Sequence, residues 1–329
     1  MQSYEDLEIQ GLLKLSRFKR RHFVPLHTSV KTNLYIPPFS NYFLRSNAIF
    51  HGVDFKIPKT TRLPRVVTIH DLGFFEESFS TMSFLTQKRA YCNYLITRLK
   101  PNRIIVPSEF IKEQLITRFP ITREIVRVAY HGSEQAMEAV INNQWNKELE
   151  GLGQFILCPG TVEIRKNCLR LIEAFEKTKA SHTVSLIFAG GAGFGYEEIR
   201  ERAAASPLSK RIHFYSELSR AKFSALYKNA LFTIYPSVYE GFGLPIVEAF
   251  ALGSPLITAN IGAMLEVAGD AAFCVNPYSV EELTGAIDIL ANDDSVRNDL
   301  AKRGHERAKF FTWKKAAIIT RGVYEELRA

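Results

Sequence analysis

The carboxyl half of the chain alternates short apolar runs with helical patterns, and this alternation constrains the fold more than any other feature. The apolar runs are 155–158, 183–189, 212–214, 231–235, 255–258 and 271–275, and the helical patterns between them are 168–180, 196–205, 219–230, 246–253 and 280–291. Consecutive apolar positions are typical of parallel strands that are covered by helices on both faces. Strand and helix repeated in this order predict a doubly wound parallel sheet.

The amino half repeats the theme more loosely. Residues 47–50, 65–69, 103–106 and 125–129 are predicted to be strands, 110–119 a helix, and 312–329 a terminal amphipathic helix with Thr312 as its N-cap. Residues 131–152 are polar and contain no strand-like run, which favours a connection between domains. We therefore expect a first α/β domain at 1–140, joined by the helix at 312–329, and a second at 150–311.

Composition limits the class of protein. With 329 residues, 46% of them hydrophobic, the chain is long enough for two cores. Its net charge of +8 predicts an acidic partner, such as a phosphorylated ligand, an anionic membrane or a nucleic acid. The four cysteines form no C-x-x-C pair, which favours buried, reduced thiols and a reducing compartment. No apolar run approaches the roughly 20 residues of a membrane span and no signal peptide is evident, so a cytoplasmic location is expected.

The stretch YPSVYEGFGLPIVEAFAL places two carboxylates, Glu240 and Glu248, around a glycine turn. Gly241 and Gly243 permit close backbone approach, and Pro245 suits the first position of a helix, whose N-terminus attracts phosphate. A carboxylate beside a phosphate is repelled, whereas it accepts hydrogen bonds well from sugar hydroxyls. A ligand with both phosphate and sugar groups resolves the conflict, with Glu248 on the ribose and Glu240 on a second sugar. The simpler alternative is that Glu248 complements the helix dipole and Glu240 is solvated.

Two further features carry charge to the ends of predicted strands. In CPGTVEIRKNCLRLIEAF, Arg165 and Lys166 follow a strand and a glycine turn, where two cations can neutralise a diphosphate without a metal. His70 and Asp71 end a predicted strand of the amino half. Each feature taken alone is also compatible with an ordinary structural role.

Together these residues resemble a retaining glycosyltransferase of family 4, whose GT-B architecture has two facing Rossmann-like domains with parallel sheets. The resemblance rests on VVTIHDL (66–72), IIVPSEFIKEQL (104–115), VRVAYHG (126–132), CPGTVEIRKNCLRLIEAF (158–175), LSRAKFSALYKNA (218–230), YPSVYEGFGLPIVEA (235–249) and LEVAGDAAFCVNP (265–277). It implies that the first domain holds the acceptor and the second the nucleotide-sugar donor.

The resemblance also implies roles for matching positions. The implied donor-binding residues are Gly160, Arg165, Lys166, Leu218, Gly241, Phe242, Gly243, Leu244 and Glu248, and the implied catalytic residues are Glu240, His70, Arg165 and Lys166. Arg165 and Lys166 would stabilise the departing diphosphate, and Glu240 would hold the transferred sugar. Glu248 would hold the ribose, Leu218 would lie near the base, and His70 would reach the donor sugar from the other domain.

The implied reaction moves a hexose from a nucleotide diphosphate sugar to a glycan or lipid-linked acceptor with retention of configuration, as in the assembly of cell-surface polysaccharides such as lipopolysaccharide. GDP-mannose is the favoured donor and a UDP-sugar the next choice. The sequence contains no D-x-D, which fits transfer without a metal, and no cofactor beyond the donor is expected.

The amino half departs from the family pattern. Residues 1–46 show no strand followed by a glycine-rich loop, so we expect the first domain to be shortened by about one β–α unit. We therefore expect fewer strands in its sheet than in the second. The same departure keeps open a catalytically silent or partner-dependent subunit as an alternative, and a GT-B sugar-nucleotide epimerase shares the donor features.

Two other readings concern partners. The basic run at 14–23 is either a solvated helix face or a contact with anionic lipid at the inner face of the membrane. Nucleic acid is not expected, because no aromatic–basic module accompanies the run. The glycines of SLIFAGGAGFGYEE invite a dinucleotide-binding interpretation, but their spacing departs from G-x-G-x-x-G.

Overall fold

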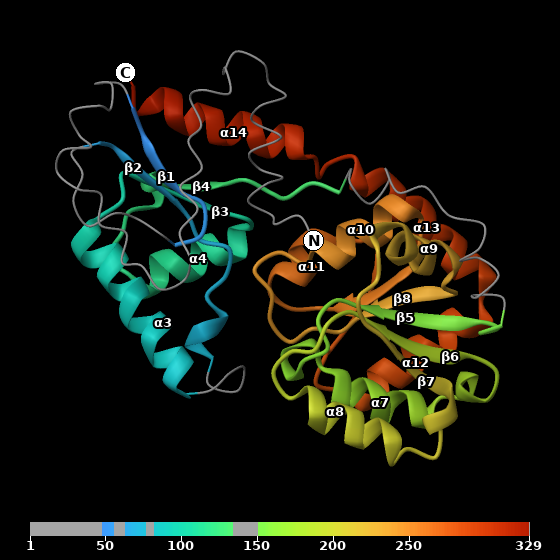
Figure 1. Ribbon diagram of the computed structural model, residues 1–329. Coiled ribbons are helices and arrows are strands. Elements are labelled where there is room, and N and C mark those ends of the chain that lie inside the picture. The colour runs from blue at the N-terminus through green and yellow to red at the C-terminus, as the bar shows by residue number, and fades with distance from the viewer. Residues whose placement is uncertain (1–47, 56–62, 77–81, 134–150, 329) are drawn as a thin grey trace. The chain divides into compact units, whose positions relative to one another are not determined.

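The computed structural model describes residues 48–55, 63–76, 82–133 and 151–328, and Figure 1 draws them as ribbons. These residues fall into two compact units. The first contains the described residues up to 132 together with the terminal segment from 312, and the second contains 133–311. Assignment of the first unit to the acceptor and of the second to the donor stays a prediction.

The first unit is built on a parallel sheet of four described strands in the order β1-β2-β3-β4. They are β1 (Phe50–Gly52), β2 (Arg65–Thr68), β3 (Arg103–Val106) and β4 (Val126–Val128), with α3 (Met82–Tyr94), the π-helical turn η4 (Leu95–Leu99) and α4 (Glu109–Arg118) between them. Helix α4 begins after Ser108, whose side chain accepts a hydrogen bond from the N–H of Ile111 at 3.2 Å. All of its strand pairings are parallel, as the sequence predicted.

The terminal helix α14 (Trp313–Glu326) packs against this first sheet although it is more than 180 residues from β4 in sequence. Trp313, Ala316 and Val323 pack with Val66 and Ile105 of the sheet. The expected N-cap is confirmed, because the Thr312 side chain accepts from the N–H of Lys315 at 3.2 Å. The chain therefore returns to its first unit at its end.

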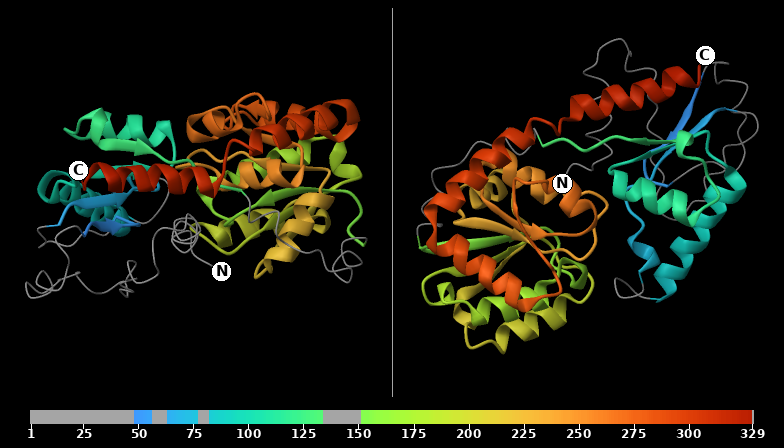
Figure 2. Two further views of the ribbon diagram at one scale, coloured as in Figure 1. Left: turned by 90° about the horizontal axis from the view of Figure 1, so that it is seen from above. Right: turned by 180° about the vertical axis from the view of Figure 1, so that it is seen from behind.

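The second unit is built on six parallel strands in the order β10-β9-β8-β5-β6-β7. The strands are β5 (Phe155–Pro159), β6 (Ser185–Ala189), β7 (Ile212–Tyr215), β8 (Phe232–Tyr235), β9 (Leu256–Ala259) and β10 (Phe273–Val275). The helices are α7 (Cys168–Lys177), α8 (Tyr196–Ala204), α9 (Arg220–Asn229), α10 (Leu244–Leu252), α11 (Gly262–Ala268), α12 (Val280–Asn292) and α13 (Asp294–Ala308). Figures 1 and 2 show α7, α8 and α12 on one face of the sheet and α9, α10, α11 and α13 on the other. The expected doubly wound parallel sheet is confirmed.

Some boundaries differ from the sequence-based expectation for local reasons. The strand expected from residue 183 begins at Ser185, because the N–H groups of Thr183 and Val184 both bond to the carbonyl of Ala180 in a turn. Helices α3, α11 and α13 were not expected. The start of α13 has a local signal, because the Asp293 carboxylate accepts from the N–H of Ser295 at 2.9 Å and from the N–H of Val296 at 3.1 Å.

Among the described residues the first sheet has four strands and the second has six, and the shortening of the first domain stays a prediction. The segment 1–46, including the basic run at 14–23, lies outside the described residues, as does most of the expected connection at 131–152. Among the helices of the described segments, none is both long and apolar enough to cross a membrane.

Gly190, which follows β6, packs so tightly that it offers a test of this fold. A Cβ at Gly190 would lie 2.1 Å from the carbonyl oxygen of Gly160, whereas a Cβ at Gly191 would meet nothing within 4 Å. We expect Gly190→Ala to lower the free energy of unfolding by about 2 kcal/mol, because backbone must move. Urea denaturation of both variants is the measurement, with Gly191→Ala as the control. Equal stability of the two would contradict the close contact of the turns after β5 and β6.

Candidate functional site

The site lies at the point where the strand order of the second sheet reverses. From β5 the chain passes to β6 and β7 on one side, and then returns to β8, β9 and β10 on the other. Neighbouring parallel strands whose connections leave in opposite directions create a crevice at their carboxyl ends, where α/β proteins bind ligands. The turns after β5 and β8 meet here, since the carbonyl of Arg165 accepts from the N–H of Val238 at 3.0 Å and from the Ser237 hydroxyl at 3.2 Å.

Glu240 is the centre of a buried cluster at this point. Its side chain is mostly buried, and its Oε2 pairs with the Arg165 guanidinium at 2.7 Å. Its Oε1 accepts from the Tyr235 hydroxyl at 2.6 Å, from the Ser237 hydroxyl at 2.8 Å and from the Lys166 ammonium. The structure thus brings together three of the four expected catalytic residues, from two turns in which Lys166 and Glu240 are 74 positions apart in sequence.

The electrostatics of the cluster keep its carboxylate charged. Burial alone would raise the pKa of Glu240, but the charges of Lys166 and Arg165 and hydrogen bonds from Lys166 and Tyr235 lower that pKa to about 2. Burial also works against the charged form of Arg165, yet the carboxylates of Glu240 and Glu163 hold its pKa above the ordinary value. Glu163 pairs with Arg165 at 2.5 Å. Two carboxylates therefore balance two cations before any ligand arrives.

Asn167 fixes the cation pair in place and was missed by sequence reasoning. Its backbone is left-handed, with φ of 63°, and its Nδ2 donates to the carbonyls of Pro277 at 2.6 Å and Pro236 at 3.2 Å. Arg170 in turn donates to its Oδ1 at 2.5 Å. Asn167 thereby ties the turn after β5 to the segments that follow β8 and β10. The available signal was an asparagine at the start of a helix, a position that is usually interpreted as a simple cap.

The glycines after β6 serve close packing. A Cβ at Gly193 would lie 2.6 Å from the Thr161 side chain and 2.8 Å from the Cβ of Glu163, and one at Gly195 would lie 2.3 Å from Ile164. The turn after β6 is therefore filled by the turn after β5. This packing explains the glycines without a bound pyrophosphate, and the dinucleotide-binding interpretation loses its main support.

Glu248 lies on α10, in its second turn. The helix begins at Leu244 after Gly243, whose φ is 100°, so Pro245 occupies the second helical position and not the expected first one. Glu248 is half-buried, and its Oε2 accepts from the Tyr227 hydroxyl of α9 at 3.0 Å. Burial raises the pKa of Glu248 to about 7, although the Tyr227 hydrogen bond and the charges of Arg220 and Lys166 oppose the rise. Tyr227 is a second residue that sequence reasoning missed.

The remaining expected site residues take varied positions. Phe242 buries its ring against Phe311 at a centroid distance of 5.7 Å, so its backbone is the part that lines the turn. Leu218 is half-buried directly before the N-cap Ser219 of α9. Gly160 follows β5, and a Cβ there would lie 3.9 Å from the Lys166 ammonium.

His70 belongs to the first unit, where its Nε2 donates to the carbonyl of Val53 at 2.8 Å. Its expected place at the donor sugar stays a prediction.

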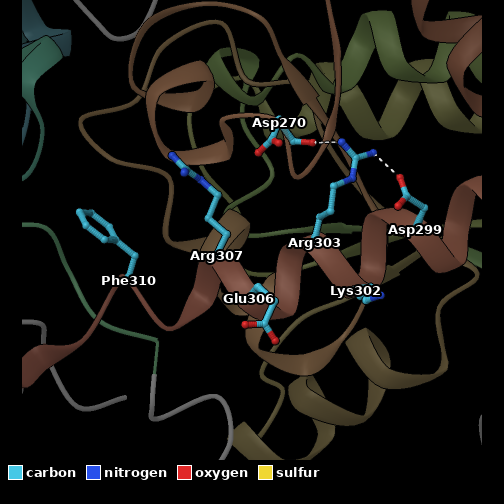
Figure 3. A pocket seen from close by; sticks show the side chains of 7 residues that line it. All are labelled: Asp270, Asp299, Lys302, Arg303, Glu306, Arg307 and Phe310. Atoms are coloured by element: carbon cyan, nitrogen blue, oxygen red, sulfur yellow. Dashed lines mark hydrogen bonds and ion pairs between the residues drawn. The ribbon is translucent and has the colours of Figure 1, made fainter.

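A separate hollow of the second unit lies beside α13 and is shown in Figure 3. Its arginines are engaged by protein acceptors: Arg303 bonds to the carbonyl of Asp270 and pairs with Asp299 at 2.6 Å, and Arg307 donates to the carbonyls of Val267 and Glu266 at 2.6 and 2.7 Å. These bonds join α13 to the end of α11. We therefore interpret the residues of this hollow as structural, and the buried cluster around Glu240 is the better candidate site.

Comparison with known proteins gives a family match and several relatives. The sequence model of the family described as Glycosyl transferases group 1 matches residues 141–307, about half of the chain. O-antigen chain mannosyltransferase B of Escherichia coli is 27% identical over 292 residues, which cover 85% of this chain and 74% of the relative. The MMP alpha-(1->4)-mannosyltransferase of Mycolicibacterium hassiacum is 37% identical over 123 residues, covering 36% of this chain and 30% of the relative.

Solved structures with the same fold include a sucrose-phosphate synthase from Thermosynechococcus elongatus, with a TM-score of 0.70 and 20% identity, covering 82% of this chain and 69% of that one. Anabaena HepE, solved in complex with UDP-glucose, has a TM-score of 0.68 and 23% identity, covering 81% and 72%. These likenesses show the GT-B fold, an α/β fold with parallel sheets, and confirm the expected fold class.

The raised pKa of Glu248 predicts a pH-dependent cost. Its folded pKa of about 7 lies above the usual 4.5, so between these values the folded state binds a proton that the unfolded state has lost. The free energy of unfolding therefore falls as pH rises from 4.5 to 7. Glu248→Gln removes this cost, and we expect it to be more stable than the parent at pH 8, by up to about 3 kcal/mol, and nearly equal at pH 4.5. Urea denaturation at both pH values measures this, and a stability difference that is the same at both would contradict it.

Proposed function

Because the chain belongs to the Glycosyl transferases group 1 family, we propose that it transfers a hexose from a nucleotide diphosphate sugar to a glycan or lipid-linked acceptor with retention of configuration. The observation that carries the proposal is the cluster of Arg165, Lys166 and Glu240 at the switch point of the second sheet. It combines fixed cations for a diphosphate with a permanently ionised carboxylate for sugar hydroxyls.

Arg165 and Lys166 act on the leaving diphosphate. An ammonium carries three N–H groups, and within the described residues Lys166 uses two of them, on Tyr235 and Glu240. Arg165 donates through NH1 to Glu240 and the carbonyl of Tyr239 and through NH2 to Glu163, which leaves part of its five-donor fork for phosphate oxygens. The cluster thus holds both cations in position while each keeps capacity for the negative charge that develops on the leaving group.

Glu240 can serve both its cations and the transferred sugar. Its Oε1 already accepts from three protein donors, whereas Oε2 receives only Arg165 among the described contacts. Oε2 is therefore the atom on which a sugar hydroxyl would bond. A charge fixed by a pKa of about 2 also favours positive charge on the sugar ring as the bond to the phosphate oxygen breaks.

Glu248 takes the ribose in this proposal. Its half-buried carboxyl is aligned by the Tyr227 hydroxyl, and a ribose diol offers two donors to its ionised form. The N-terminus of α10, where the backbone of Gly243 and Leu244 begins the helix, adds positive potential for the phosphates. Sugar, phosphate and ribose would then each meet a group of suitable charge.

The transfer itself is a front-face substitution. The bond between the anomeric carbon and the leaving phosphate oxygen breaks, and the acceptor hydroxyl bonds to that carbon from the same side. The hydroxyl proton passes to the leaving diphosphate, which Arg165 and Lys166 stabilise. His70 is proposed to contact the donor sugar from the first unit, and no metal is required in this scheme.

The substrates are proposed from the relatives. Two are named as mannosyltransferases, and one of them acts on an O-antigen chain by its name, which favours a mannose donor such as GDP-mannose and an acceptor of cell-surface polysaccharide assembly. HepE was solved with UDP-glucose, so a UDP-sugar is the second candidate. We place the protein at the inner face of the membrane, where lipid-linked acceptors are reached.

A nucleotide diphosphate sugar should stabilise the protein in the presence of EDTA. At 100 times its dissociation constant a ligand adds about 2.7 kcal/mol to the free energy of unfolding. We expect this gain with GDP-mannose or a UDP-sugar in a thermal-unfolding screen, and the same gain with and without chelator, because Arg165 and Lys166 supply the positive charge. Stabilisation that disappears in EDTA would overturn the metal-free scheme.

Substitutions of the two glutamates should impair different properties of the protein, turnover for Glu240 and nucleotide binding for Glu248. Glu240→Gln should lower turnover by about 100-fold or more, because a charge that acts on the transition state is lost, while nucleotide diphosphate affinity stays close to that of the parent. Glu248→Ala should weaken nucleotide binding. Kinetics and calorimetry on both variants measure this, and Glu248→Gln serves as the control that keeps the side-chain volume. An equal loss of nucleotide affinity in Glu240→Gln and Glu248→Ala would disprove the division of roles.

A further inference from the structure

Helix α3 of the first unit presents an exposed aromatic stripe that the proposed transfer reaction does not use. Phe84 is 48% exposed, Tyr91 is 37% exposed and Tyr94 is 36% exposed. Their spacing of seven and three residues places them along one side of the helix, while Leu85 and Cys92 are fully buried on the other side. Large aromatic side chains exposed in a row on one helix mark an interaction surface more often than isolated ones do.

The stretch of chain that carries this stripe has charges of one sign, although Glu76, Glu77 and Glu109 flank it. Residues 78–108 contain Lys88, Arg89, Arg98, Lys100 and Arg103 and no aspartate or glutamate. Lys88 lies over the Phe84 ring at 5.6 Å, and Arg98 is exposed in the turn η4 that continues the helix. Arg89 is not part of the surface, because it donates to the carbonyls of Phe74 and Phe75 at 2.8 Å.

We propose that the exposed side of α3 and η4, formed by Phe84, Lys88, Tyr91, Tyr94 and Arg98, docks on an anionic lipid surface. Tyrosine prefers the headgroup region of a bilayer, because one end of its side chain is apolar and the other is hydrated, and phenylalanine can enter the apolar layer beneath. Lysine and arginine beside them meet the negative lipid headgroups while their carbon chains lie along the apolar layer. Residues 78–108 themselves contribute no acidic side chain that would oppose such contact.

The same features disfavour a second copy of the chain on this surface. Two copies that met through α3 would bring Lys88 and Arg98 of each against like charges. An anionic bilayer satisfies the rings and the cations together. The proposal is independent of the transfer reaction and of the basic run at 14–23, because it rests on residues of α3 and η4 alone.

Vesicle co-sedimentation of the full chain tests the proposal, without donor or acceptor. The vesicles contain equal phosphatidylglycerol and phosphatidylcholine, and pure phosphatidylcholine is the neutral reference. We expect Lys88→Glu with Arg98→Glu, and separately Phe84→Ala with Tyr91→Ala, each to weaken partitioning onto the anionic vesicles by about tenfold or more. Added salt should weaken the binding of the parent chain, since the attraction is screened.

Matched controls come from the second unit. Lys210→Glu with Lys302→Glu makes the same charge change at exposed positions, and Tyr278→Ala removes a ring that is 60% exposed. These controls should partition onto the anionic vesicles at least three times more strongly than the α3 variants. That difference is about the contribution of one lysine or arginine in contact with anionic lipid. The charge variant of α3 tests the proposal even if the aromatic variant fails to fold, which thermal unfolding reveals.

Three results would overturn the proposal. The α3 variants could partition like the parent while neutralising the run at 14–23 removes all binding, which would assign docking to that run. The controls could lose as much binding as the α3 variants, which would show attraction by net charge alone. The α3 variants could change the sedimentation from dimer to monomer without any effect on vesicles, which would make the surface a protein interface.

Discussion

The ion pair between Glu240 and the cations Lys166 and Arg165 is the interaction on which the candidate site depends. It joins the turns after β5 and β8 at the crevice that the reversal of strand order creates. Removing one partner of a buried ion pair leaves an unpaired charge and is strongly destabilising, which keeps all three side chains in one arrangement. The cost of burying these charges is offset by hydrogen bonds from Tyr235 and Ser237.

This arrangement has a consequence for catalysis. In the proposed transfer, cations that Glu240 and Glu163 already hold would need little reorganisation when a diphosphate departs, and prior organisation is the main source of electrostatic catalysis. Asn167 extends the same principle outward, because it bonds the cation turn to the carbonyls of Pro236 and Pro277. A glycosyltransferase can thus place positive charge at the leaving group with side chains that its own fold holds in position.

Much of the architecture was predictable because it depends on local patterns. Consecutive apolar residues at 155–158 and 231–235 identified buried parallel strands, and the regular alternation with helices predicted the doubly wound sheet that the structure shows. Helix α11 was not predicted, because it has seven residues and no side-chain cap. Strand β6 begins later than predicted, because the N–H groups that precede it bond to the carbonyl of Ala180 in a turn. Such details depend on contacts that a periodicity does not contain.

The sequence by itself determined the fold class, the family and the residue types gathered near the ends of β5 and β8, since these follow from patterns within about 20 neighbouring residues. Only the tertiary structure decided which of those residues meet. It pairs Glu240 with Lys166 across 74 positions in sequence, hydrogen-bonds the Tyr227 hydroxyl to Glu248, and packs α14 against the first sheet. Pairing between distant residues is set by strand order and helix packing, and neither leaves a mark on the local pattern of the chain.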